Sequence, residues 1–122
     1  ARFNATLKRH GVARIPEPVA RKLRGRKFKN WQDFRQEFWK AVDEIPGIRD
    51  QFSRSSQGRI AKRPALAPRV PQHAADARMG RGANSLNLDH TRDIADGGGV
   101  YDLGNIRVMT PRRHADKTYG PQ

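Results

Sequence analysis

The sequence predicts an α+β fold, in which a mainly helical N-terminal part precedes two short strands and a last short helix. Three observations predict this fold. Apolar residues recur at helical spacing between residues 31 and 45, apolar and polar residues alternate over 86–88 and 105–110, and Thr110-Pro111 then marks a helix start. A chain of 122 residues is long enough for one modest hydrophobic core. We therefore expect a single domain over residues 1–122.

The first part of the chain is basic and weakly patterned. Residues 1–14 have no clear period, so we expect a flexible basic lead-in. Pro16 and Pro18 introduce a short helix over residues 19–23, and Gly25 ends it. This helix is the first regular element that the sequence predicts.

The strongest helix signal follows. Asn30 is a suitable N-cap, Asp33 lies in the first turn, where carboxylates are favoured, and Pro46-Gly47 stops the pattern. The apolar stripe between these signals consists of Trp31, Phe34, Phe38, Val42 and Ile45. An aromatic residue in such a stripe can stack on a nucleic-acid base, but helical spacing favours a place in the core, which is our interpretation.

Residues 53–84 have a weaker pattern, because serine, glycine and proline interrupt it and several arginines add charge. The simplest interpretation is a long surface loop. About 30 residues without structure are unusual inside a compact domain unless they bind something, so this segment is also a candidate partner surface. Ile60, Leu66 and Val70 are the residues that can attach it to the core.

The last part, residues 86–118, carries the polar residues of interest. Alternation around Asn87 predicts a strand that delivers Asp89 and His90 at its end. A wide loop over 91–99 ends in three glycines, which permit a positive φ and a close approach of the backbone. The second predicted strand begins at Asn105, and the helix after it contains His114. We expect Asp89, His90, Asn105 and His114 to converge.

Composition restricts the class of partner. Lys and Arg number 25 against 12 Asp and Glu, which gives a formal net charge of +13. Such a charge predicts a polyanionic partner, of which nucleic acid is favoured over an anionic membrane surface or an acidic protein. No apolar run is long enough to span a membrane, and the start of the chain does not have the pattern of a signal peptide. The absence of cysteine excludes disulfides and thiolate zinc sites.

The converging residues suit hydrolysis of a phosphodiester bond. This reaction needs a base for the attacking water, a cation on the phosphate, and a fixed orientation of the base. An imidazole such as His90 is mostly neutral near pH 7 and suits the first role. Asp89 points to the opposite side of the extended chain, where it can face a metal together with His114. The Asn105 amide both donates and accepts, so it can hold the loop.

The same residues carry a resemblance to a known family. The segment from Leu88-Asp89-His90 through Gly97-Gly98-Gly99 and Asn105-Ile106 to His114 resembles the HNH, or ββα-metal, nuclease motif. It is most similar to the cytotoxic DNase domain of nuclease bacteriocins, the colicins and S-type pyocins. Upstream segments are similar to the helical part of that domain, so the resemblance covers most of residues 13–117.

The resemblance implies a role for each matching residue. His90 matches the general base, Asn105 the residue that orients the active-site loop, and His114 a metal ligand. Asp89 stands where these bacteriocins usually have a ligand His, and Thr118 stands where they usually have a further one. Either Arg78 or Arg81 matches the arginine close to the motif, so both are counted with the catalytic residues.

These departures affect the expected metal. One carboxylate and one imidazole form a harder and more open site than three imidazoles. We expect one divalent ion, with Mg²⁺ favoured and Mn²⁺, Ni²⁺ or Zn²⁺ possible, held by Asp89 and His114 with water and phosphate oxygens. Asp93 remains a candidate for a third ligand.

Two basic sets complete the expected sites. Contacts to the phosphates of DNA bind without reading sequence, and we assign them to Arg21, Lys22, Arg24, Arg26, Lys27, Lys29, Arg107, Arg112 and Arg113. The family likeness also implies an acidic immunity protein, which inhibits the nuclease and contacts residues within 54–75. For that partner the expected residues are Arg54, Arg59, Arg63, Leu66 and Arg69.

The sequence thus predicts a metal-dependent DNA endonuclease of little sequence specificity, which is the cytotoxic domain of a bacteriocin. The family implies that it is secreted within a larger protein and acts in the cytoplasm of a target bacterium. Two alternatives stay open: a basic nucleic-acid-binding module whose degenerate HNH site does not cut, and an HNH nuclease that acts on RNA.

Overall fold

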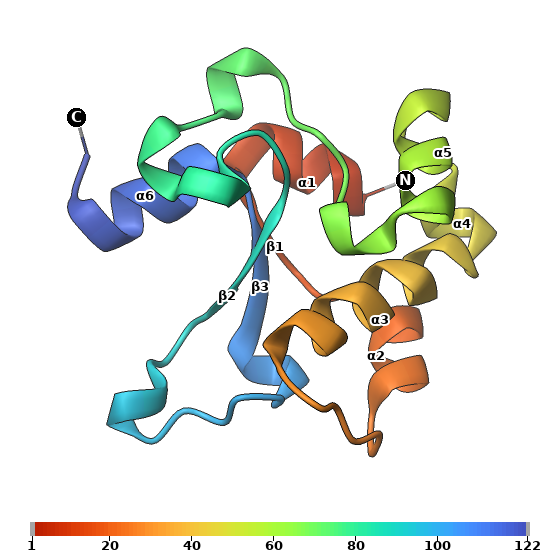
Figure 1. The fold of residues 1–122 in the computed structure, drawn as a ribbon, viewed down its shortest axis with the longest axis horizontal. Helices are drawn as coiled ribbons and strands as arrows, with labels where there is room; N and C mark the ends of the chain where they lie inside the picture. The colour runs from red at the N-terminus through yellow and green to blue at the C-terminus, as the bar shows by residue number, and fades with distance from the viewer. Residues whose placement is uncertain (1, 122) are drawn as a thin grey trace.

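The computed structural model describes residues 2–121, except for the side chain of Asp96. Its centre is a three-stranded antiparallel sheet of β1 (Val12–Arg14), β2 (Asn87–His90) and β3 (Ile106–Met109), in the order β1-β3-β2. In Figure 1 the sheet runs through the middle of the molecule, with helices α2 to α5 on one side and α6 on the other. Mixed helix and sheet confirm the predicted α+β class.

Helix α3 (Trp31–Asp43) forms the centre of the core. The Asn30 side chain accepts a hydrogen bond from the Asp33 N–H over 2.8 Å, which confirms the predicted N-cap. Phe34, Phe38 and Trp39 are fully buried in one hydrophobic core with residues of the sheet, and α3 contacts α2 (Glu17–Leu23). The predicted stripe is therefore mostly core. Ile45 falls beyond the helix, because α4 (Pro46–Arg49) begins directly after it.

The expected flexible lead-in is wrong. Residues Phe3–His10 form α1, and Val12–Arg14 pair with β3 as an edge strand. Phe3 and Leu7 lie one helical turn apart and are both buried, and the Phe3 ring meets Phe52 edge-on at 6.2 Å. Tertiary packing of this apolar face stabilises a helix whose basic sequence alone gives little signal.

The segment 53–84 also contains more structure than a surface loop. Helix α5 (Arg54–Lys62) begins where the Ser53 hydroxyl accepts from the Ser56 N–H, and its Ile60 is buried. Short 3₁₀ turns follow at Pro64–Leu66 (η1), Gln72–Ala74 (η2) and Ala77–Gly82 (η3). Serine and glycine have low helix propensity, so the sequence of α5 did not predict a helix. Capping and packing overcome this low propensity in the folded domain.

The C-terminal unit follows the predicted order. β2 and β3 pair so that His90 lies opposite Ile106 and Asp89 opposite Arg107. Short turns at Ile94–Asp96 (η4) and Leu103–Asn105 (η5) shape the long connection between the strands. Helix α6 (Pro111–Tyr119) then starts at Thr110, whose hydroxyl accepts from the Arg113 N–H, as the Thr-Pro pair predicted. None of the described helices is both long and apolar enough to cross a membrane.

Candidate active site

His90 and Asp89 are the last two residues of β2, and they face different helices. Because side chains alternate along a strand, adjacent residues point to opposite faces. The Asp89 carboxylate contacts α6 through His114, whereas the His90 ring lies 4.7 Å from the Trp31 ring of α3. The contacts confirm the expected opposite orientation of the two side chains.

The contacts of His90 define its tautomer. Its Nε2 lies 2.8 Å from the Val100 carbonyl oxygen, which can only accept. Nε2 therefore carries the hydrogen, and in the neutral ring Nδ1 is left with a free lone pair. A fixed imidazole with one basic nitrogen is what a general base requires.

The loop between the strands is held by the Asn105 amide. Its oxygen accepts from the Arg92 N–H over 2.7 Å, and its nitrogen donates to the Arg92 and Gly99 carbonyls over 3.0 and 3.3 Å. This clamp fixes the segment that presents the Val100 carbonyl to His90. Asn105 thus holds the loop in the manner the sequence suggested, without touching the His90 ring through a described hydrogen bond.

Two glycines make this loop possible for different reasons. Gly97 has φ +93°, a conformation that L-residues with a side chain rarely adopt. At Gly98 a Cβ atom would collide with the Arg92 carbonyl and approach the Asn105 amide to 2.8 Å. The sequence predicted that glycines here permit a positive φ and a close approach of the backbone. Gly97 supplies the first property and its neighbour Gly98 the second.

Asp89 and His114 form the other half of the site. The Asp89 Oδ1 atom lies 3.3 Å from His114 Nε2, and the His114 Nδ1 atom lies 3.0 Å from the Asn87 amide oxygen. The Asn87 amide nitrogen donates to the Gly82 and Ser85 carbonyls, so the oxygen is held toward the ring. Nδ1 therefore donates, and in the neutral ring Nε2 presents its lone pair beside Asp89.

This pair fits two ligands of one divalent cation. Atoms that share a cation at about 2.1 Å lie about 3.0 to 3.4 Å apart, depending on the coordination angle. The oxygen and nitrogen separation of 3.3 Å falls in that range. Among the described residues, no group of three or more acidic or His side chains surrounds the position, so a bound ion would complete its shell with water or phosphate.

Lys117 is a further residue of the site, for which the sequence predicted no role. Its Nζ donates to Asp89 Oδ2 and to the His90 carbonyl oxygen, both at 2.5 Å. Partial burial of Asp89 raises its pKa, but hydrogen bonds and charges from the protonated form of His114 and from Lys117 outweigh burial and lower the pKa to about 2. Lys117 lies three positions after His114 on α6, and this spacing on one helix face was the available signal.

Trp31 was also missed as a neighbour of the site. Its ring stacks on Phe34 at 5.0 Å and tilts against His90 at 4.7 Å, so it joins the core to the candidate base. Tyr101 extends the same cluster, with its ring 6.2 Å from Trp31. This cluster of aromatic rings packs, through Trp31, against the side of the His90 imidazole that faces α3 and restricts its movement.

With this geometry established, comparison with known proteins identifies the family. The family model described as "Colicin/Pyocin-S2, DNase domain" matches residues 2–119. The chain belongs to the colicin and pyocin DNase-domain family. This finding confirms the family that the HNH-like motif predicted.

Relatives of this DNase domain occur in two bacterial species. Colicin-E8 of Escherichia coli is 40% identical over 104 residues, which cover 85% of this chain and 48% of that protein. Pyocin-S2 of Pseudomonas aeruginosa is 41% identical over 104 residues, which cover 85% of this chain and 14% of that protein. The chain therefore spans about half the length, or less, of these relatives.

Solved structures show the same DNase-domain fold. The crystal structure of the pyocin AP41 DNase-immunity complex matches with a TM-score of 0.81 at 28% identity, over 93% of this chain and 84% of that chain. The mutant nuclease domain of pyocin S8 with its cognate immunity protein matches with a TM-score of 0.75 at 35% identity, over 85% and 78%. Both similarities confirm the predicted fold class.

Arg78 and Arg81 lie away from the reacting groups of this DNase domain. Arg78 bonds to Asp76 and Asp116 at 2.7 and 2.8 Å and donates to the Gly120 carbonyl, so it braces α6. Arg81 lines a cavity with Arg59 and Arg69. In the described residues neither arginine forms a hydrogen bond to Asp89, His90, Asn105 or His114. The structure therefore does not bring them together with these four residues, and their catalytic role stays a prediction.

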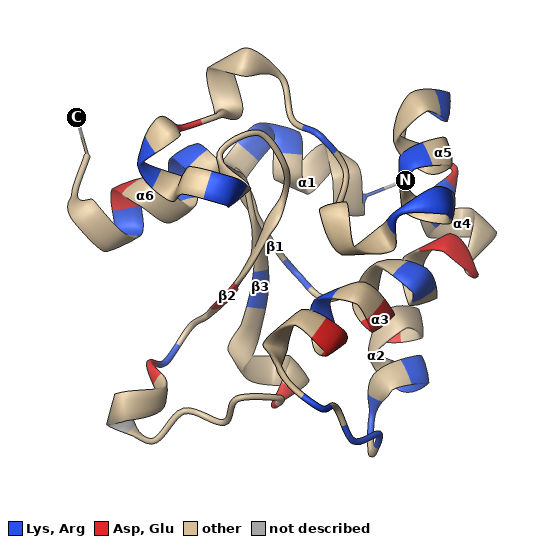
Figure 2. Ribbon diagram, viewed as in Figure 1, with Lys and Arg blue, Asp and Glu red and all other residues tan. Residues whose placement is uncertain are grey.

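The expected nucleic-acid contacts are spread over several elements. Arg21 and Arg24 pair with Glu17 and Arg26 pairs with Glu37, so three of them already have acidic partners within the domain. Arg107 donates to the Gly104 and Ile106 carbonyls beside the site. Figure 2 shows Lys and Arg on both sides of the sheet, whereas acidic residues are fewer and scattered. The positive surface of this DNase domain is therefore broad.

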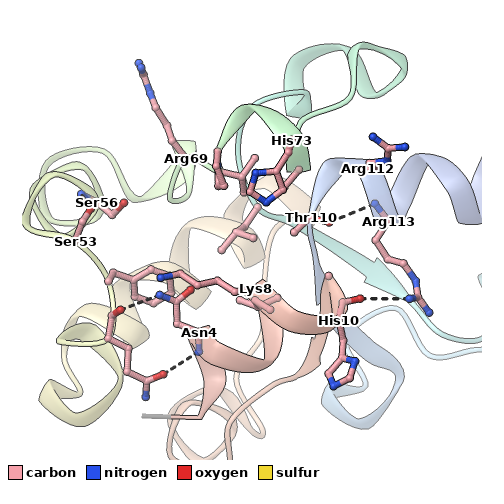
Figure 3. Close-up of a pocket in the computed structure, with 18 of the residues that line it drawn as sticks. Asn4, Lys8, His10, Ser53, Ser56, Arg69, His73, Thr110, Arg112 and Arg113 are labelled. Atoms are coloured by element: carbon pink, nitrogen blue, oxygen red, sulfur yellow. Dashed lines mark hydrogen bonds between the residues drawn. The ribbon is translucent and has the colours of Figure 1, made fainter.

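A large cavity of the domain is distinct from the candidate active site. It has a volume of about 800 Å³ between α1, α5, η2 and another face of α6, and it contains neither Asp89, His90 nor Asn105 (Figure 3). Arg112 and Arg113 of the expected nucleic-acid set line it together with Lys8 and Arg69.

The Asp76–Arg78 pair yields a prediction about stability and pH. Hydrogen bonds from the Arg78 side chain and backbone N–H lower the pKa of Asp76 to about 2, below its ordinary value of about 4. A lowered folded-state pKa contributes stability above pH 4 that is lost as the pH falls toward 2. We expect Asp76→Asn to lower the free energy of unfolding at pH 7, with the difference from wild type shrinking between about pH 4 and pH 2.

Chemical denaturation at a series of pH values measures this difference. Asp50→Asn is the matched control, because Asp50 is exposed and pairs only with its neighbour Arg49 among the described ion pairs. An equal loss for both variants, or a loss at D76N that persists unchanged to pH 2, would contradict the stabilising role of the pair.

Proposed function

We propose that this domain is a divalent-metal-dependent endonuclease that hydrolyses DNA with little sequence preference. It would act as the cytotoxic part of a longer, secreted bacteriocin in the cytoplasm of a target bacterium. The observation that carries the proposal is a fixed imidazole, His90, next in sequence to a carboxylate that meets His114 at 3.3 Å. A base and a cation-binding pair at one strand end are the two requirements of phosphodiester hydrolysis.

Each residue has a defined part in this proposal. His90 Nδ1 accepts a proton from the attacking water, while the Val100 carbonyl keeps the ring in the required tautomer. Asn105 holds the loop that supplies that carbonyl, and Asn87 holds His114. Asp89 and His114 would hold the metal, whose positive charge stabilises the phosphate and the leaving oxygen when it is bound.

The proposal also concerns specificity. The candidate site addresses a phosphate, and no described contact of its side chains selects a base edge. Arg107, Arg112 and Arg113 belong to the elements that carry the site, β3 and α6, where they can bind neighbouring phosphates. Such contacts bind all sequences and weaken as salt rises.

The nuclease structures that resemble this domain contain immunity proteins, and we propose an acidic inhibitor for this chain as well. Arg59, Arg69 and Arg81 line a cavity of about 450 Å³. Burial lowers the pKa of Arg59, and the nearby charges of Arg69 and Arg63 lower it further, so a carboxylate placed there relieves repulsion. Arg59 also donates to the Ala67 carbonyl at 2.6 Å, which supports the turn that leaves Leu66 exposed.

Replacing the base separates cutting from binding. We expect His90→Ala to reduce plasmid nicking by about a hundredfold or more, because the attacking water loses its base, while DNA affinity stays near that of wild type. His73→Ala, at an exposed His on η2, is the control for a lost imidazole. Nicking at the wild-type rate in H90A would refute the assignment of the base. Absence of cutting by the wild type would favour the binding-module alternative.

A metal series on DNA and RNA side by side tests the cofactor and the substrate. A carboxylate, an imidazole and several waters form an oxygen-rich site, so we expect nicking with Mg²⁺ and with Mn²⁺ as a substitute. DNA is expected to be cut faster than RNA. Full activity with Zn²⁺ and none with Mg²⁺ would contradict the metal preference, and faster cutting of RNA would contradict the substrate.

Charge reversal tests the inhibitor surface. We expect Arg69→Glu to weaken the complex with the cognate immunity protein by about tenfold or more and to reduce its salt dependence, because an acidic partner would then meet a like charge. Arg14→Glu, on the edge strand β1, is the control for the same change in net charge. Equal weakening by both variants in surface plasmon resonance would show a general charge effect and would contradict a specific contact at Arg69.

A further inference from the structure

Lys117 joins the two halves of the candidate site, and no part of the proposed hydrolysis uses it. Its ammonium group contacts Asp89, which belongs to the cation-binding half, and the carbonyl of His90, which belongs to the base. The Lys117 side chain is 35% exposed, so it is not enclosed by the domain. Such a position is unusual for a lysine that serves only as a surface charge.

The contacts divide the Asp89 carboxylate between two partners. Oδ1 lies beside His114 Nε2, whereas Oδ2 is bound by Lys117 at 2.5 Å. A carboxylate held at one oxygen cannot rotate freely, so Lys117 keeps the other oxygen turned toward His114. This orientation is the one in which Asp89 and His114 can share a cation.

Lys117 also changes the charge of the site. Asp89 and Lys117 together are neutral, so an arriving divalent cation meets a carboxylate that is already paired. Unlike charges attract and like charges repel strongly at a few ångström when water is partly excluded. Lys117 therefore opposes the binding of a divalent cation even while it orients one of the ligands.

The remaining donor of Lys117 suits a phosphate. A lysine ammonium has three N–H donors, and the two described contacts use two of them. The third has no acceptor among the hydrogen bonds described for Lys117. A positive donor fixed next to the base and the cation-binding pair can bind a phosphate oxygen without reorganising.

We propose that Lys117 is the fixed cation of the active site: it orients Asp89, weakens the binding of a divalent ion, and donates its third N–H to the scissile phosphate. The last role rests on the proposed endonuclease activity, whereas the first two do not. Lys117 would then be a catalytic residue that supplies part of the positive charge at the phosphate.

Isothermal titration calorimetry of the 122-residue chain with Mn²⁺ alone tests the effect of Lys117 on metal binding. We expect Lys117→Met to bind Mn²⁺ about tenfold more tightly than wild type, because the repelling charge is gone. Lys117→Arg keeps the charge and should bind like wild type. Lys62→Met, at an exposed lysine on α5, controls for the change in net charge. Equal or weaker binding of Mn²⁺ by K117M than by wild type overturns the proposal.

Plasmid nicking at saturating Mn²⁺ tests the phosphate contact. We expect K117M to cut about a hundredfold more slowly than wild type although its metal site is full, K117R to retain much of the rate, and K62M to be unchanged. A wild-type rate in K117M overturns the phosphate role. Thermal unfolding verifies that each variant is folded. If K117M does not fold, Lys117→Gln replaces it in both measurements.

The two measurements also separate this proposal from the proposed function. A wild type that fails to cut with any metal refutes the endonuclease, whereas the Mn²⁺ titration contains no DNA and still judges Lys117. Tighter Mn²⁺ binding by K117M in that case supports Lys117 as the charge that opposes the metal. Absence of binding in both proteins refutes it.

Discussion

The antiparallel pairing of β2 with β3 is the constraint on which the candidate site depends. With His90 opposite Ile106, the chain that leaves β2 returns beside it, and the Thr91 N–H donates to the Asn105 carbonyl over 2.7 Å. The continuation of β3 then starts α6 at Thr110, which brings His114 back to β2. A slip of one residue would turn Asp89 away from α6 and toward α3, because side chains alternate along a strand. One register thus positions the base, the loop and the cation-binding pair together.

Local signals in the sequence predicted what this register requires. The Asn30 and Thr110 caps mark the starts of α3 and α6, and the glycines at 97 and 98 occupy positions that other residues would strain or block. Such signals act within a few residues and need no knowledge of the fold. For the same reason the bounds of β2 and β3 were predicted to within one or two residues. The side chains of His90 and Asn105 contact backbone groups of the loop between β2 and β3, which lies close to them in sequence.

What the sequence could not show depends on contacts between distant segments. Helix α1 is stable because Phe3 meets Phe52, about fifty positions along the chain, and α5 is stable because Ile60 is buried. The roles of Arg78 and Lys117 likewise come from partners on other elements. Arginines and lysines that look alike in the sequence therefore have different contacts in the structure. Some are paired within the domain, some line cavities, and one holds the Asp89 carboxylate. Net charge alone predicts a polyanionic partner, but it does not distinguish these uses.

The two halves of the site also differ in what holds them. The Val100 carbonyl fixes His90, and the clamp of Asn105 acts on the N–H and carbonyl groups of the loop, so this half relies largely on backbone atoms that any residue supplies. The other half relies on side chains throughout, since Asp89 and His114 are positioned by Lys117 and by the Asn87 amide. Substitution can therefore change the affinity for a cation while the base remains in place. The two departures from the bacteriocin motif that the resemblance implies, at Asp89 and Thr118, concern this cation-binding half.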